Sequence, residues 1–196
     1  MIESMDEKWE HLVKWLRILM YTAIVSFANS LLNYLPLIPA AVTTWVSRGV
    51  MLAKVVCFLQ LGSVSACYRR VGILRAVLFA ITLVTTFLYG STILALLTVI
   101  LSLVATYQEY HAHGEAAEEK DARLAARWRG LFGWSLAASL LLSVGSSIIT
   151  MILVGQDVPA AGISSITNAV LKIPGYVIDV IYILSIRRMI MPEDPV

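Results

Sequence analysis

Six long apolar stretches, separated by short polar or turn-forming segments, dominate the pattern of the chain. They run over residues 15–36, 45–68, 71–89, 91–107, 131–154 and 163–186. Each is close to the about 20 mainly apolar residues that a helix needs to cross the hydrocarbon core of a bilayer. The pattern predicts an all-α polytopic membrane protein with one transmembrane domain, residues 1–196, made of six transmembrane helices in three hairpins.

Residues that interrupt helices mark the turns of these hairpins. Pro36 and Pro39 follow the first stretch, Gly90 separates the third from the fourth, and Pro159 lies within residues 155–162 before the last. The third and fourth stretches are nearly continuous, so one long buried segment is a competing interpretation. Their combined length is about twice a bilayer span, which favours a tight hairpin.

The longest hydrophilic segment, residues 108–130, joins the fourth and fifth stretches. Leu124 and Trp128 lie four residues apart among charged residues, as on a helix that rests on a membrane surface. Glu119 and Arg123 are spaced for an i,i+4 ion pair. The segment therefore predicts a cytoplasmic amphipathic helix, and a solvated connector fits the same pattern.

Composition supports the membrane interpretation. Hydrophobic residues make up 59% of the chain and charged residues 14%, against about 45–50% and about 25% in soluble domains. The lipid bilayer is therefore the expected partner, and nothing in the charge balance suggests nucleic-acid binding.

Basic residues predict the orientation. Twelve of the fifteen Lys and Arg residues fall on one side of the predicted spans, one lies near the other side, and two lie inside spans. The twelve are Lys8, Lys14, Arg17, Arg69, Arg70, Arg75, Lys120, Arg123, Arg127, Arg129, Arg187 and Arg188. The positive-inside rule places both termini in the cytoplasm. A short, loop-poor and cysteine-poor chain of this kind is typical of a bacterial inner (cytoplasmic) membrane.

The first and last hairpins resemble each other. The interval from Lys54 to Arg69 equals that from Lys172 to Arg187, and each hairpin turns at a Pro-Ala-Ala. A parallel duplication and a chance similarity of apolar spans both remain open.

The two lysines inside spans are the strongest site candidates. A cation in a span costs about 2.5–3.5 kcal/mol on insertion scales, so Lys54 and Lys172 are expected to face a ligand or a partner. Asp179 lies two turns beyond Lys172 on the same helix face. Pro174 and Gly175 lie between those charges and permit a kink or local unwinding, as in transporter sites. The alternative is that the lysines snorkel to the headgroups or pair structurally.

Two further polar residues complete the predicted ligand site. Gln60 reaches about the depth of Asp179, and Asn29 reaches about that of the lysines. Together Asn29, Lys54, Gln60, Lys172 and Asp179 are expected to form a polar cluster near the Pro174-Gly175 pair. Hydrogen bonding that joins helices is an equally good interpretation.

Catalytic patterns are weak. Residues 118–123 match the EExxxR signature of intramembrane prenyl-endopeptidase-like proteins, but no histidine follows His113 to complete such a site. A cysteine peptidase would need a cytoplasmic Cys and His close together; Cys67 and His111 lie at cytoplasmic span ends, but no local motif supports them. His111 and His113 diverge on a helix and are not expected to share a metal. The sequence thus predicts no catalytic residues, no metal site and no cofactor.

These observations favour a small-solute transporter or the substrate-capture subunit of one. The size, six spans and inward termini resemble the capture subunits of energy-coupling-factor vitamin transporters, a resemblance of architecture alone. The alternative is a non-catalytic scaffold or accessory subunit with a membrane-protein partner or as a homo-oligomer. A membrane-embedded enzyme is the minority interpretation.

Overall fold

The computed structural model describes residues 5–33, 38–87, 92–118, 121–154 and 160–191. They form six α-helices and no strand. The helices are α1 (Met5–Leu32), α2 (Ala40–Leu61), α3 (Ala66–Phe87), α4 (Thr92–Glu118), α5 (Ala122–Val154) and α6 (Ala160–Ile190). The predicted all-α class with six helices is confirmed.

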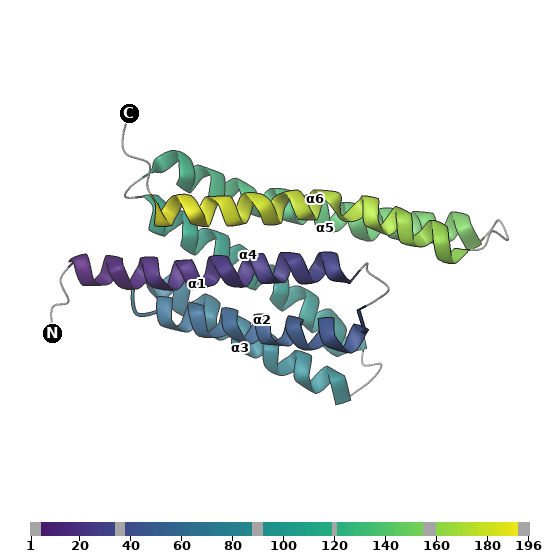
Figure 1. Ribbon diagram of the computed structural model, residues 1–196, viewed down its shortest axis with the longest axis horizontal. Coiled ribbons are helices and arrows are strands. Elements are labelled where there is room, and N and C mark those ends of the chain that lie inside the picture. The colour runs from purple at the N-terminus through teal and green to yellow at the C-terminus, as the bar shows by residue number, and fades with distance from the viewer. Residues whose placement is uncertain (1–4, 34–37, 88–91, 119–120, 155–159, 192–196) are drawn as a thin grey trace.

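The helices form a closed ring. Each packs against the next in sequence, and α1 also packs against α6. Consecutive helices run in opposite directions, so the start of α1 and the end of α6 lie at the same end of the molecule (Figure 1). We call this the terminal end. It also carries the α2–α3 and α4–α5 connections (Figure 1).

The second hairpin consists of two separate helices, α3 and α4, packed side by side. The competing interpretation of one long segment is therefore wrong, although Gly90 lies outside the described residues. The preceding boundary also changes, because α2 ends at Leu61 and Tyr68 belongs to α3. A Cβ on Gly62 would lie 2.9 Å from the Arg69 Cα, so the close α2–α3 turn depends on glycine.

Residues 108–130 form no separate surface helix. The α4 helix continues to Glu118, and α5 begins at Ala122. Asp121 caps α5, because its carboxylate accepts hydrogen bonds from the backbone N–H groups of Arg123 (2.9 Å) and Leu124 (3.0 Å). Strong helix formers before and after Asp121 therefore extend α4 and α5 beyond the apolar stretches. The predicted pair of Glu119 with Arg123 lies partly outside the described residues.

The core is concentrated toward the terminal end. Leu16, Phe58, Tyr68, Trp128 and Ile186 come from five different helices and are fully buried there. In contrast, large hydrophobic side chains are exposed on all six helices, including Trp45 (67%), Ile93 (81%) and Met151 (78%). The outer surface of the ring is thus strongly apolar.

Two helices of the described chain, over Glu7–Leu32 and Ala40–Leu61, are long and apolar enough to cross a membrane. Their length and composition are weakly consistent with association with a membrane.

Candidate functional site: two adjoining polar cavities

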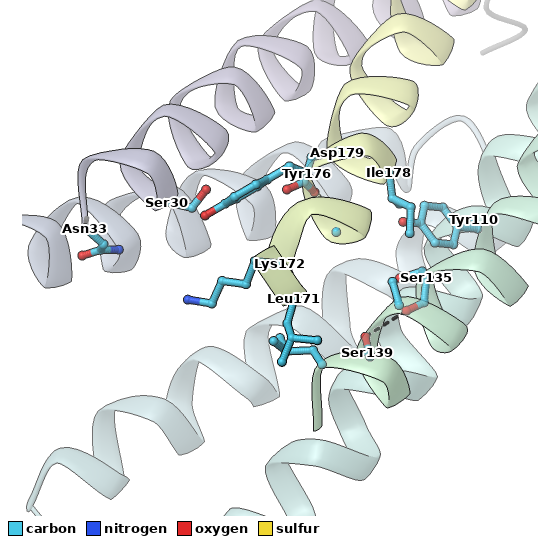
Figure 2. A pocket seen from close by; sticks show the side chains of 13 residues that line it. Ser30, Asn33, Tyr110, Ser135, Ser139, Leu171, Lys172, Tyr176, Ile178 and Asp179 are labelled. Carbon is cyan, nitrogen blue, oxygen red and sulfur yellow. Dashed lines mark hydrogen bonds between the residues drawn. The ribbon is translucent and has the colours of Figure 1, made fainter. Parts of the chain in front are cut away.

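The larger cavity lies between α1, α4, α5 and α6 and has a volume of about 350 Å³ (Figure 2). Its polar lining is made of one cation, one carboxylate, hydroxyl groups and an amide. These come from Ser30, Asn33, Tyr110, Ser135, Ser139, Lys172, Tyr176 and Asp179. A cavity of this size and polarity suits a small polar molecule.

The smaller cavity, about 190 Å³, lies at the centre of the ring. All six helices contribute to its wall. Its lining consists of Ala23, Ser26, Lys54, Arg75, Thr106, Glu109, Tyr110, Ser135, Asp179 and Tyr182. Two cations and two carboxylates therefore line a space that has room for only a few water molecules.

The two cavities adjoin. Tyr110, Ser135 and Asp179 line both of them. Figure 2 shows Tyr110 and Ser135 on facing helices, with Asp179 on α6 across from them. Because α6 runs toward the terminal end, the order Lys172, Asp179, Tyr182 places the larger cavity farther from that end than the smaller one.

The α6 helix presents the predicted charges to the same space. Lys172 and Asp179, seven residues apart, both line the larger cavity, as does Gly175 (Figure 2). The helix stays α-helical through Pro174 and Gly175, so the residues do not unwind it. Proline still removes one backbone donor from this turn.

Lys54 is half-buried and lines the smaller cavity with Asp179. Glu109, Arg75 and Asp179 all act electrostatically on its ammonium group. The structure therefore brings Lys54 and Asp179 to one cavity, and Lys172 and Asp179 to the other.

The remaining two predicted ligand residues lie elsewhere. Gln60 is exposed, and its backbone carbonyl accepts a hydrogen bond from the Ser63 hydroxyl at 2.8 Å. Asn29 is buried, and its amide donates to the carbonyl of Thr43 (3.0 Å) and the hydroxyl of Ser47 (2.9 Å). Asn29 thus joins α1 to α2, and neither residue lines these cavities.

The structure adds an ion pair that sequence reasoning missed. Arg75 on α3 donates to the carboxylate of Glu109 on α4, and the hydroxyl of Tyr182 on α6 donates to the other oxygen of that carboxylate. The sequence assigned Arg75 to the cytoplasmic side and Glu109 to the loop. A signal was present, because Arg75 follows Arg69 by almost two helical turns and must lie deeper in the bundle.

A buried aromatic cluster surrounds His113, which sits one turn beyond Glu109 on α4. The imidazole packs against Phe58, Tyr68, Trp128 and Tyr182, with the Trp128 ring centroid 4.6 Å away. Its Nδ1 lies 2.9 Å from the Tyr68 hydroxyl and its Nε2 lies 3.4 Å from the Tyr182 hydroxyl. The Glu109 side chain is thereby linked to the terminal end of the bundle.

Cys67 and His111 do not form a nucleophile–base pair. The His111 Nε2 lies 3.2 Å from the exposed Glu115 carboxylate, and the imidazole ring stacks on Tyr107. Cys57 and Cys67 both carry free thiols, and Cys57 is buried in the core. Among the described residues, no group of three His, Cys, Asp or Glu side chains is placed to hold a metal ion.

Comparison of the chain with protein-family models, with curated proteins and with solved structures gives no match.

Proposed function

We propose that this chain is an integral membrane protein with six transmembrane helices that binds a small solute inside its helix ring and moves or delivers it across a membrane. The observation that carries the proposal is the contrast between the two faces of the ring. Charged side chains line two cavities between the helices, while large hydrophobic side chains are exposed on every helix. Soluble monomers rarely expose apolar surface on this scale.

The charge distribution supports the same orientation as the sequence pattern. Lys8, Arg70, Arg127 and Arg187 lie within about two turns of the ends of α1, α3, α5 and α6 that meet at the terminal end. The positive-inside rule would place that end in the cytoplasm. The larger cavity would then lie toward the opposite side of the membrane and the smaller one toward the cytoplasm.

The lining indicates the chemistry of the solute. Lys172 in the larger cavity and Lys54 in the smaller one offer ammonium groups to an anionic group such as a carboxylate or phosphate. Asp179, shared by both cavities, would bind a cationic or hydroxyl group of the same molecule. Passage between the cavities requires only that the solute moves past Tyr110, Ser135 and Asp179.

The proposal is tested by native mass spectrometry of the protein in mild detergent. We expect a discrete small molecule bound to the wild type and lost from the Lys54→Met, Lys172→Met double variant. The matched control is Lys8→Met with Lys14→Met, which removes the same charge from exposed positions on α1. Solute retained by the double variant would overturn the assignment of the site.

The same spectrum reports an alternative outcome. A wild-type protein without solute, held in a defined complex with another chain, would replace the transport proposal with that of an accessory subunit.

A further inference from the structure

A continuous hydrogen-bonded chain leads from the smaller cavity toward the terminal end. Tyr182 Oη lies 2.5 Å from Glu109 Oε1, His113 Nε2 lies 3.4 Å from Tyr182 Oη, and Tyr68 Oη lies 2.9 Å from His113 Nδ1. The four side chains alternate between α4, α6, α4 and α3. Glu109 itself faces the cavity.

The donors of this chain all point the same way. Tyr182 donates to Glu109, so its oxygen must accept from His113, which places the imidazole proton on Nε2. The unprotonated Nδ1 then accepts from the Tyr68 hydroxyl. Every hydrogen therefore points from Tyr68 toward Glu109, which is the arrangement that a stepwise proton shift requires.

We propose that Tyr68, His113, Tyr182 and Glu109 form a proton path, and that the proton is the coupling ion for solute movement. The inference rests on the proposed function, since coupling has meaning only for a protein that moves a solute. Chains of carboxylates, histidines and their neighbours serve as proton relays in membrane pumps and transporters.

One proton moves along the chain in four transfers. Glu109 Oε1 takes the Tyr182 hydroxyl proton, Tyr182 takes the proton of His113 Nε2, His113 Nδ1 takes the Tyr68 hydroxyl proton, and Tyr68 takes a proton from the terminal side. One proton reaches Glu109 and each of the other groups ends neutral. The next groups toward solvent are Cys67 and Glu115, which act electrostatically on Tyr68. The Glu115 carboxylate is 43% exposed.

Coupling follows from the ion pair. Arg75 stabilises the ionised form of Glu109, so the carboxylate has a low affinity for the proton while the pair is intact. An anionic solute that binds the Arg75 guanidinium, whose Nε is buried without a hydrogen-bond partner, would weaken the pair and let Glu109 take up the proton. Solute binding and protonation would then occur together.

Several charged or titratable groups face this path and act on it. The groups that face Glu109 come from four helices: Lys54 from α2, Arg75 from α3, Tyr110 and His113 from α4, and Asp179 and Tyr182 from α6. The α1 and α5 helices contribute the neutral Ser26 and Ser135 to the cavity wall beside it. Around His113 they are Tyr68, Glu109 and Tyr182.

The first experiment uses time-resolved infrared spectroscopy of an Arg75→Gln variant, in which Glu109 can take up a proton without its partner. We expect a protonated carboxyl band after a drop in pH, absent when Glu109→Gln is added. Adding Tyr182→Phe or His113→Gln should slow its appearance by at least about tenfold without changing its final intensity. The control Tyr107→Phe removes an exposed hydroxyl outside the chain and should leave the rate unchanged.

An unchanged rate in both path variants, or no carboxyl band at all, would overturn the proton path. A second measurement needs no change at Arg75. Nitrogen-15 spectra of histidine-labelled wild type, assigned with His113→Gln, should show the His113 proton on Nε2. A proton on Nδ1 would reverse the donor order and overturn the inference. Neither the infrared nor the nitrogen-15 measurement depends on solute retention. The proton path can therefore be overturned while the proposed function stands, and the proposed function can be overturned while the proton path stands.

Discussion

The guanidinium of Arg75 and the carboxylate of Glu109 meet at 2.5 Å and join α3 to α4 at the centre of the helix ring. Only 4% of the Glu109 side chain and 21% of the Arg75 side chain are exposed. Charges this poorly solvated depend on each other, because either one alone would face an interior that cannot hydrate it.

Loss of one member of this pair should therefore be costly. We expect Arg75→Gln or Glu109→Gln to lower the free energy of unfolding by about 3–5 kcal/mol, and the double variant to lose much less than the sum. Unfolding in detergent, followed by circular dichroism, gives the double-mutant cycle. The exposed pair of Arg129 with Glu118 (50% and 55% exposed) is the control, with a coupling of about 0–1 kcal/mol. Additive losses at Arg75 and Glu109 would contradict the interpretation.

Asn29 should act as a structural link and not as a ligand. Its replacement by alanine removes the hydrogen bonds to the Thr43 carbonyl and the Ser47 hydroxyl. We expect a loss of about 1–3 kcal/mol in unfolding free energy, with solute retention preserved in the fraction that stays folded. Asn33→Ala, at an exposed position that lines the larger cavity, should show the opposite pattern. A stable Asn29→Ala protein that has lost its solute would return Asn29 to the binding site.

Asp121 should make the start of α5 sensitive to acid. Hydrogen bonds from the Leu124 and Arg123 backbone N–H groups, together with Arg188, hold the pKa of this carboxyl below its ordinary value of 3.8. A depressed folded-state pKa stabilises the protein above the ordinary value, and this stabilisation is lost as pH falls through the folded-state pKa. The melting temperature of wild type should therefore fall more steeply below about pH 4 than that of Asp121→Asn. Parallel curves would exclude this role.

The orientation of the ring can be tested with single cysteines in a Cys57→Ser, Cys67→Ser background. Thr44 near the start of α2 and Ser63 in the turn that follows α2 are both exposed. We expect Ser63→Cys to react with a membrane-impermeant maleimide only after cells are opened, and Thr44→Cys to react in intact cells. The reverse pattern would invert the proposed orientation, and reaction of both in intact cells would contradict a membrane-spanning α2.

Hydrophobic pattern was sufficient to predict the number and class of the helices, because apolar stretches of span length set both. It could not place their ends. Residues 108–130 are polar and yet helical at both ends, since helix propensity and the Asp121 cap extend α4 and α5 beyond the apolar pattern. That error of boundary hid Glu109 and His113, which were assigned to an amphipathic segment outside the spans.

The sequence indicated only some of the residues that line the two cavities. Helical spacing alone placed Lys172 and Asp179 on one face of α6, and both line one cavity. Gln60 and Asn29 do not line these cavities, because depth along a helix does not determine which face a side chain occupies. Spacing from Arg69 indicates the depth of Arg75, but the contacts of Arg75 and Tyr182 with Glu109 join residues far apart in sequence, and a single sequence does not indicate which of them meet.

Closure of the ring by α6 makes the last helix decisive for assembly. It supplies Lys172, Asp179 and Tyr182, so the walls of both cavities and the middle of the hydrogen-bonded chain are missing until it docks beside α1. In the proposed membrane-spanning protein, the Arg75 and Glu109 charges would face lipid or a neighbouring protein until α6 docks. We therefore expect a chain that stalls after α5 to be a substrate for membrane quality control, because these unpaired charges would mark it as unfinished.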